Sequence, residues 1–255
     1  MFELTGRTIL VTGASKGIGA AIVEALGAAG GHVVAHFGSD RRGAEAATAQ
    51  IPRERVKLIG ADLVDAAAAD QLWQEAVSWR GRIDVLVNNA AVMRLEGGIT
   101  DSDDVWDRVW AEALQVNVLA PARLMRHAVR HYLEQRGGIL ITLSSWAAQR
   151  GPGNPALIAY AASKGAILSA TKAIARNYAK NNILAYSVAP GVVRTRLSEQ
   201  ASAATGGEAA VTATLAMGEW VPPSDLGSLM VFLASGACRH LSGATLDVNG
   251  ASYIR

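Results

Sequence analysis

The chain has 255 residues, 50% of them hydrophobic, and a formal net charge of +2. This size predicts one compact domain, residues 1–255, with a large core. Lys and Arg are spread along the chain and no apolar run is long enough to span a bilayer, so we expect neither nucleic acid nor a membrane as partner. The single cysteine, Cys238, rules out an internal disulfide, and the N-terminus has no signal-peptide core. We therefore expect a cytoplasmic protein.

Apolar β-branched runs alternate with helical patterns along the chain. The predicted strands are 8–11, 33–37, 56–59, 83–87, 139–143, 184–188 and 245–248, and the predicted helices are 17–29, 41–50, 66–80, 103–135, 158–180 and 224–235. Continuous apolar strands separated by helices are typical of a parallel sheet that is covered on both faces. Right-handed crossovers make this a doubly wound α/β fold with seven parallel strands. The weakly patterned stretch 198–216 predicts a substrate lid at about 194–220.

A glycine-rich turn lies between the first predicted strand and the first helix. Gly13, Gly17 and Gly19 lack a Cβ, which lets the backbone approach a pyrophosphate, and the helix N-terminus supplies N–H donors. Tight packing of a helix on a strand could produce the same glycines. Their place directly after the first strand favours a dinucleotide site.

A phenol, an ammonium group and a hydroxyl lie close together in the second half of the chain. Tyr160 and Lys164 are one helical turn apart and share a helix face, and Ser145 precedes them. Ketone reduction needs a hydrogen-bond donor and then a proton at the carbonyl oxygen as hydride arrives at carbon. A free tyrosine has a pKa of about 10, and a nearby ammonium favours the phenolate. We therefore expect Lys164 to lower the pKa of Tyr160.

Taken together, these motifs resemble the short-chain dehydrogenase/reductase family. The matching segments are residues 12–19, Asp62, Asn88-Asn89-Ala90, Asn117, Ser145, Tyr160 with Lys164, and Pro190-Gly191 with Thr195, which span nearly the whole chain. The resemblance implies a Rossmann fold and NAD(P)-dependent interconversion of a secondary alcohol and a ketone.

The same resemblance assigns roles to four catalytic residues. Tyr160 would be the acid/base, and Lys164 would modulate it and bind a ribose hydroxyl. Ser145 would be a second donor to the substrate oxygen, with Ser144 as its rival. Asn117 would hold a water that relays protons to bulk solvent.

The end of the second predicted strand bears on the choice of nicotinamide. NAD enzymes of this kind usually place an Asp there, and this chain has Phe37. Lys16, Arg41 and Arg42 suit the 2′-phosphate of NADP, whereas Asp40 could bind a ribose hydroxyl or cap the next helix. We expect NADP(H), with NAD(H) as the alternative. The expected cofactor residues are Gly13, Ser15, Lys16, Gly17, Ile18, Gly19, Phe37, Ser39, Arg41, Arg42, Asp62, Leu63, Asn89, Ala90, Ala91, Tyr160, Lys164, Pro190, Gly191, Val193 and Thr195.

The expected substrate pocket is mostly apolar and aromatic. Its predicted residues are Met93, Arg94, Ser145, Trp146, Ala147, Leu157, Tyr160, Val192, Met217 and Trp220. This set favours a hydrophobic or cyclic carbonyl compound, although both tryptophans could instead fill an oligomer interface. The alternatives are a 3-oxoacyl thioester on an acyl carrier, an NAD-dependent alcohol or polyol dehydrogenase, and a non-catalytic dinucleotide-binding regulator. Arg94 could meet an anionic substrate group or be solvated.

Three sequence features depart from the family pattern, one of them Tyr186 at a place often held by Asn. Ala91 replaces the glycine of Asn-Asn-Ala-Gly and requires a negative φ, and Asn249-Gly250-Ala251 replaces Asp-Gly-Gly. His127 and His131 have the spacing of a zinc pair, but no third ligand is evident, so we expect no metal.

Partners are expected from two helical stretches. The family resemblance implies a homotetramer or homodimer through helices at about 117–135 and 158–180, where Ala161, Ala162, Gly165 and Ala166 allow close approach. The arginines of the first stretch could dock an acidic carrier protein or simply form a solvated face.

Overall fold

Seven parallel strands form one sheet in the computed structural model, which describes residues 2–203 and 206–255. The strands are β1 (Thr8–Val11), β2 (His32–Phe37), β3 (Val56–Gly60), β4 (Val85–Asn88), β5 (Gly138–Leu143), β6 (Ile183–Pro190) and β7 (Thr245–Val248). Their order is β3-β2-β1-β4-β5-β6-β7, with every pairing parallel. The doubly wound seven-stranded fold is confirmed.

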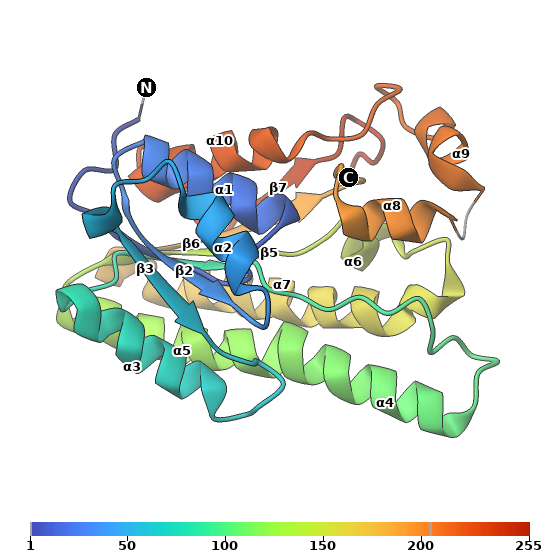
Figure 1. Ribbon diagram of the computed structural model, residues 1–255, viewed down its shortest axis with the longest axis horizontal. Coiled ribbons are helices and arrows are strands. Elements are labelled where there is room, and N and C mark those ends of the chain that lie inside the picture. The colour runs from blue at the N-terminus through green and yellow to red at the C-terminus, as the bar shows by residue number, and fades with distance from the viewer. Residues whose placement is uncertain (1, 204–205) are drawn as a thin grey trace.

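Helices cover both faces of the sheet (Figure 1). One layer contains α1 (Gly17–Ala28), α2 (Arg41–Thr48) and α10 (Pro223–Ser235), and the other contains α3 (Ala68–Arg80), α4 (Asp103–Leu114), α5 (Ala120–Glu134) and α7 (Ile158–Tyr178). The short helices α6 (Ala147–Arg150), α8 (Arg196–Ala203) and α9 (Gly207–Ala213) follow β5 and β6, and α8 and α9 lie together at one end of the molecule. No described helix has the length and hydropathy needed to cross a bilayer.

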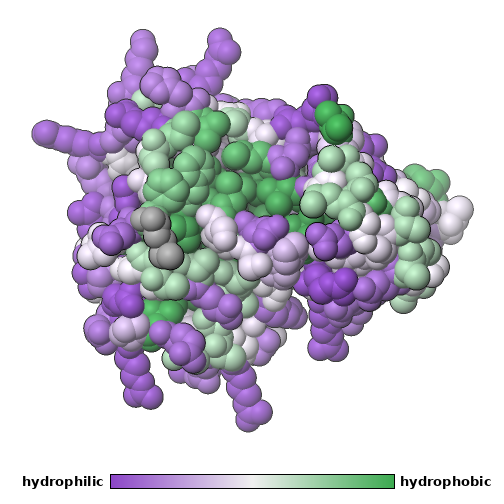
Figure 2. All heavy atoms as spheres, turned by 90° about the horizontal axis from the view of Figure 1, so that it is seen from above, coloured by the Kyte–Doolittle hydropathy of each residue, from purple (hydrophilic) through white to green (hydrophobic). Residues whose placement is uncertain are grey.

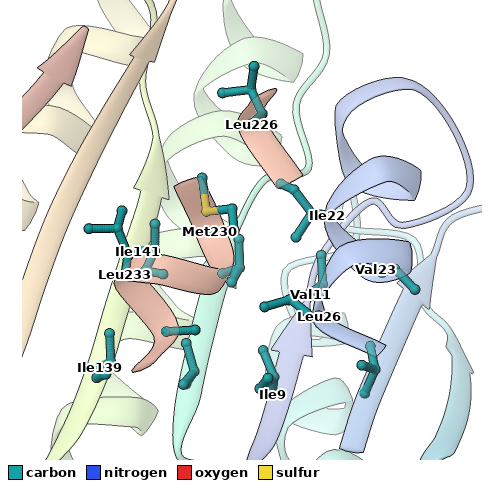
Figure 3. Close-up of a cluster of buried hydrophobic side chains, with 14 of the residues drawn as sticks. Ile9, Val11, Ile22, Val23, Leu26, Ile139, Ile141, Leu226, Met230 and Leu233 are labelled. Carbon is teal, nitrogen blue, oxygen red and sulfur yellow. The ribbon is translucent and has the colours of Figure 1, made fainter. Parts of the chain in front are cut away.

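Alternating side chains of the central strand β1 supply both halves of the core. Ile9 and Val11 belong to the cluster that includes α1 and α10, whereas Leu10 packs with residues of α3 and α5. Figure 3 shows the first cluster, in which side chains of both helices lie over the β1 and β5 residues. This two-sided burial is the reason that the strands are continuously apolar in sequence.

The predicted helix at 103–135 is interrupted. A π-helical turn, Gln115–Leu119, separates α4 from α5 and contains Asn117. Pro121, at the start of α5, has no N–H to donate to the carbonyl of Asn117 four residues earlier. The proline thus explains why regular α-helical bonding is lost where Asn117 lies.

The predicted lid region contains the two helices α8 and α9, while residues 204 and 205 lie outside the described part of the chain.

Hydrophobic residues gather over α10 on the face that is on top in Figure 1 and turned toward the viewer in Figure 2. Leu229, Val231 and Phe232 of this helix are only partly buried.

Candidate active site

A cavity of about 1050 Å³ opens at the carboxyl ends of the strands. It brings together the glycine-rich turn, the residues that follow β3 to β6, and the helices α7, α8 and α9. The predicted site residues that line it are Gly13, Ser15, Lys16, Gly17, Ile18, Gly19, Ser39, Asp62, Leu63, Asn89, Ala90, Ala91, Met93, Arg94, Ser145, Trp146, Ala147, Leu157, Tyr160, Lys164, Pro190, Gly191, Val192, Val193 and Thr195. Ligands of doubly wound folds bind at this edge of the sheet.

Three predicted cofactor residues do not line this cavity. The Phe37 ring is buried against Gly60, its partner across β2 and β3. Arg41 forms an ion pair with Glu45 one helical turn later, at 2.9 Å. Arg42, in the same first turn of α2, is exposed outside the cavity.

Two predicted substrate residues also lie elsewhere. Trp220 is buried, donates its Nε1–H to Thr212 at 2.8 Å, and carries the Arg194 guanidinium over its ring. Met217 is exposed and lies against Gly250. The pocket wall on this side is instead made by Leu197, Ala201, Ala210 and Val211 of α8 and α9. These four residues lie within the predicted lid at about 194–220, but no motif distinguished them as pocket residues.

The glycine-rich turn is a close-packed cradle. A Cβ on Gly19 would lie 1.9 Å from the Gly13 carbonyl oxygen, so no side chain fits there. Asn89 Nδ2 donates to the carbonyls of Thr12 and Gly13 at 2.8 and 3.0 Å. Asn89 therefore holds the turn in place, which is a positioning contact between β4 and the turn.

His36 is a cavity residue that sequence reasoning missed. Its Nδ1 accepts a hydrogen bond from the Gly13 amide at 3.1 Å, so Nε2–H donates to the Ala61 carbonyl at 2.9 Å. Burial lowers the pKa of His36, which favours this neutral form. The ring ties the glycine turn to the ends of β2 and β3. One buried histidine within a strand has no distinguishing pattern.

Two carboxylates lie at the β2–β3 end of the cavity. Asp40 caps α2 by accepting a hydrogen bond from the Gly43 amide at 2.9 Å. Of the two roles expected for Asp40, this is the helix cap. Asp62 accepts from the Val64 amide at 3.0 Å and forms a turn ahead of α3. Both side chains line the cavity.

The catalytic candidates meet where β5 ends beside α7. Lys164 is buried, donates from Nζ to the Leu143 carbonyl at 2.8 Å, and places Nζ 5.8 Å from the centre of the Tyr160 ring. The Ser144 hydroxyl donates to the Lys164 carbonyl at 3.0 Å, so it packs strand against helix. The Ser145 hydroxyl accepts from the Ala147 amide at 3.1 Å and adjoins Tyr160. This geometry favours Ser145 over Ser144 as the second donor to the substrate oxygen.

Burial dominates the protonation of the pair. It raises the pKa of Tyr160, and hydrogen bonding with Ser145 acts in the opposite direction with a smaller effect. The same desolvation lowers the pKa of the Lys164 ammonium to about 8. We expected Lys164 to lower the pKa of Tyr160; the net shift is upward, because loss of hydration penalises the phenolate.

Asn117 lies behind the cavity and does not line it. Its Oδ1 accepts from the Val92 amide at 2.8 Å, and its Nδ2 donates to the Val92 carbonyl at 2.9 Å and to the Ser163 hydroxyl at 3.0 Å. Ser163 in turn donates to the Tyr160 carbonyl at 2.7 Å. The Asn117 side chain thereby connects the π-helical turn to the part of α7 that carries Tyr160 and Lys164.

Other predicted polar residues have protein partners. Arg94 forms two hydrogen bonds with Glu112, at 2.7 and 2.6 Å. His127 contacts Asp70 at 2.6 Å, and His131 accepts from the Ile83 amide at 3.1 Å. No cluster of three metal-ligating side chains occurs in the described ranges.

The two departures at glycine positions of the family pattern differ in conformation. Ala91 is not among the described non-glycine residues with positive φ, whereas Ala251 has a φ of 57°. An alanine thus occupies the left-handed region where the family pattern has glycine.

Known proteins resemble this chain over its whole length. A family model described as "Enoyl-(Acyl carrier protein) reductase" matches residues 13–251. The chain is 32% identical to 3beta-hydroxysteroid dehydrogenase 1 of Eggerthella lenta, over 99% of this chain and 95% of that protein. It is 30% identical to 3-oxoacyl-[acyl-carrier-protein] reductase FabG of Vibrio harveyi, over 99% of both.

Solved structures agree with this similarity. The short-chain dehydrogenase/reductase SDR:Glucose/ribitol dehydrogenase of Brucella melitensis matches with a TM-score of 0.87 and 29% identity, over 100% of this chain and 99% of that one. The 3-oxoacyl (acyl-carrier-protein) reductase of Agrobacterium tumefaciens C58, which has NADP bound, matches with a TM-score of 0.86 and 30% identity, over 98% and 95%. The chain therefore belongs to the short-chain dehydrogenase/reductase family, NAD(P)-dependent oxidoreductases that act on alcohol and ketone groups.

Proposed function

We propose that the protein is an NADP(H)-dependent oxidoreductase that interconverts a secondary alcohol and a ketone, with Tyr160 as the proton donor and acceptor. The observation that carries this proposal is the position of Tyr160. Its side chain is partly buried and adjoins Ser145, and it lines the same cavity as Lys164 and the glycine-rich turn. A protonated phenol there is suited to donate to a carbonyl oxygen.

The chain's own residues handle the proton. In the reductive direction Tyr160 donates its proton to the oxygen that gains negative charge, while the Ser145 hydroxyl supplies a second hydrogen bond. Lys164, with a pKa of about 8, is suited to hold the proton that later restores the phenol near neutral pH. When bound, the nicotinamide supplies or accepts the hydride.

Asn117 has a positioning role in this scheme. Its side chain fixes Val92 and Ser163, as its hydrogen bonds indicate. Its backbone carbonyl cannot receive an α-helical bond from Pro121. That carbonyl is a suitable acceptor for the relay water assigned to Asn117 by family resemblance.

The residues of the cavity fit a dinucleotide. A Cβ on Gly13 would meet Ala90 and one on Gly19 would meet the Gly13 carbonyl, so these glycines let the turn pack closely on the end of β4. The helix α1 begins at Gly17, and its first residues line the cavity, where N-terminal amides are suited to bind a pyrophosphate. Three observations support a preference for NADP(H) over NAD(H). Lys16 lies in the turn, position 37 holds a phenylalanine rather than a carboxylate, and Asp40 already serves as a helix cap. Arg41 and Arg42 begin the adjacent α2, and each would need to turn from its present position to reach a 2′-phosphate.

A direct binding experiment tests the cofactor preference. NADPH and NADH are titrated separately while tryptophan fluorescence is followed. We expect NADPH to bind at least tenfold more tightly, and Lys16→Ala to reduce this preference. Tighter binding of NADH would reject NADP(H) as the cofactor.

The substrate is a carbonyl compound with a hydrophobic or cyclic body. Leu157, Val192, Leu197 and Val211 line its part of the cavity, which favours an apolar group beside Tyr160. A 3-oxoacyl thioester carried by an acyl-carrier protein and a polyol are the competing substrates. A non-catalytic regulator is the alternative from another class; the presence of Tyr160 and Lys164 in one cavity argues against it.

A substrate panel tests the reaction class. Cyclic and aliphatic ketones, a 3-oxoacyl thioester and a polyol are incubated with each nicotinamide, and the absorbance of the reduced form is followed. We expect turnover with ketones and NADPH. Cofactor binding without turnover of any compound would support the regulator instead.

We also propose a single-domain cytoplasmic enzyme that forms a homotetramer or homodimer. The helices α5 and α7 would provide the contact, because Leu119 and Leu133 of this region are exposed. Light scattering at micromolar concentration tests this assembly, and a monomer mass would contradict it.

A further inference from the structure

The charged residues that line the cavity are unevenly distributed. Among its described lining residues, the carboxylates are Asp40 and Asp62, both at the β2–β3 end. Arg94, Arg150 and Arg196 line the part formed by the strand-end loops, α6 and α8. The part of the cavity outside the β2–β3 end thus has cationic as well as apolar lining residues.

These arginines are not equivalent. Arg94 is neutralised by its paired hydrogen bonds to Glu112. Arg196 follows Thr195, whose side chain lies against Gly17 of the glycine-rich turn, so Arg196 begins α8 beside the cofactor cradle. Arg150 ends α6, the short helix that begins directly after Ser145 and Trp146.

Arg150 makes a cation–π contact rather than an ion pair. Its guanidinium carbon lies 4.5 Å from the centre of the Trp146 ring. That ring is itself positioned beside Gly191, because a Cβ there would lie 3.5 Å from Trp146 Cε3. In the described part of the chain, no carboxylate or carbonyl accepts a hydrogen bond from this guanidinium. This contact with an aromatic face attracts the cation to the ring and leaves the guanidinium N–H donors without a protein acceptor.

We propose that Arg150 binds an oxyanion group of the substrate, so that the preferred substrate is a ketone or secondary alcohol that carries a carboxylate or phosphate. A planar guanidinium with unused N–H donors matches either anion through two parallel hydrogen bonds. The inference rests on the proposed reaction and narrows its substrate class. The apolar wall and Arg150 then contact different parts of one molecule: the wall packs on the body, and Arg150 binds the anionic end.

Matched substrate pairs test this proposal. Levulinate and its longer homologues are each compared with their methyl esters, and dihydroxyacetone phosphate is compared with dihydroxyacetone, with NADPH as reductant. We expect the protein to favour the anionic member of at least one pair, and the better anion distinguishes carboxylate from phosphate. Added salt should weaken this preference because it screens the exposed arginine.

Arg150→Met keeps an unbranched side chain on Trp146 and removes the charge. We expect about a tenfold or greater loss of kcat/KM for the anionic substrate, mainly as a higher KM, with the ester changed less than twofold. NADPH affinity should not change. The exposed Arg53, in the turn before β3, provides the control Arg53→Met, which should leave both substrates unaffected.

Three results would overturn the assignment: no charge preference in the wild type, an equal loss for acid and ester in Arg150→Met, or a weakened NADPH affinity in that variant. Reduction of esters without a charge preference rejects this inference alone. Absence of NADPH oxidation with every ketone rejects the proposed reaction on which it rests.

Discussion

The ionisation of the buried Lys164 makes the free energy of unfolding depend on pH. Because burial lowers its pKa from 10.5 to about 8, the unfolded chain binds more protons than the folded chain between these values. The free energy of unfolding therefore gains a favourable contribution as the pH rises through this window. Below about pH 8 the cost of burying the ammonium is fully present.

This linkage gives a measurable prediction. We compare the free energy of unfolding of the wild type with that of Lys164→Met by urea unfolding. Between about pH 7.5 and 9.5 the value for the wild type should rise by about 2 kcal/mol relative to that of the variant. Lys172 is exposed on the same helix, so the free energy of unfolding of Lys172→Met should show the same pH dependence as that of the wild type. A constant difference between the wild type and Lys164→Met across this range would show that Lys164 is not buried as a titrating amine.

Ala251 stores backbone strain. Its φ of 57° is in the left-handed region, which costs an L-residue with a Cβ about 1–2 kcal/mol. Ala251→Gly should therefore raise the free energy of unfolding by about 0.5–1 kcal/mol, after the greater flexibility of the unfolded glycine chain is counted. Ala49→Gly, at an exposed site with a φ of −59°, should instead lower it by a similar amount. Thermal unfolding of both variants checks these opposite signs.

At the scale of elements, the glycine-rich turn depends on close contact between backbone segments. A methyl group on Gly19 would overlap the Gly13 carbonyl and lie 2.6 Å from Asn89 Nδ2. Gly19→Ala should therefore displace the turn from β4 and weaken NADPH binding at least tenfold, as measured by fluorescence titration. Gly165→Ala, in α7, is a matched control because its Cβ meets nothing within 4 Å. Equal NADPH affinity in Gly19→Ala and the wild type would contradict this packing.

Regular elements were predictable because hydrophobic periodicity is a local signal. All seven predicted strands occur, and the ends differ by a few residues. The break at Asn117 was not predicted, because α4 and α5 continue one helical pattern and the effect of Pro121 on bonding depends on geometry. The helices α8 and α9 were not predicted for a different reason, because their Ala-rich sequence has little amphipathic pattern.

The site was predictable to the extent that its residues occur in motifs. Ser145, Tyr160 and Lys164 line one cavity with the glycine-rich turn. Trp220 and Phe37 were misplaced because sequence position cannot say whether a side chain points into a cavity or into the core. His36 and Arg150 lack a motif, and their roles follow from three-dimensional contacts with Gly13 and Trp146.

At the scale of the whole molecule, the parallel sheet gathers distant segments at one edge. Residues from Gly13 to Thr214 meet there, because each strand delivers its following loop to the same side. Removal of one functional group should thus abolish the chemistry while the rest of the cavity still binds the cofactor.

Tyr160→Phe removes only the hydroxyl and is the most direct test of the proposed mechanism. NADPH binding, followed by fluorescence, should stay within about threefold of the wild type, and circular dichroism should be unchanged. Ketone-dependent NADPH oxidation should fall by at least about a hundredfold, because the proton donor is absent. Ketone reduction at a rate near that of the wild type would contradict the assignment of Tyr160 as the acid.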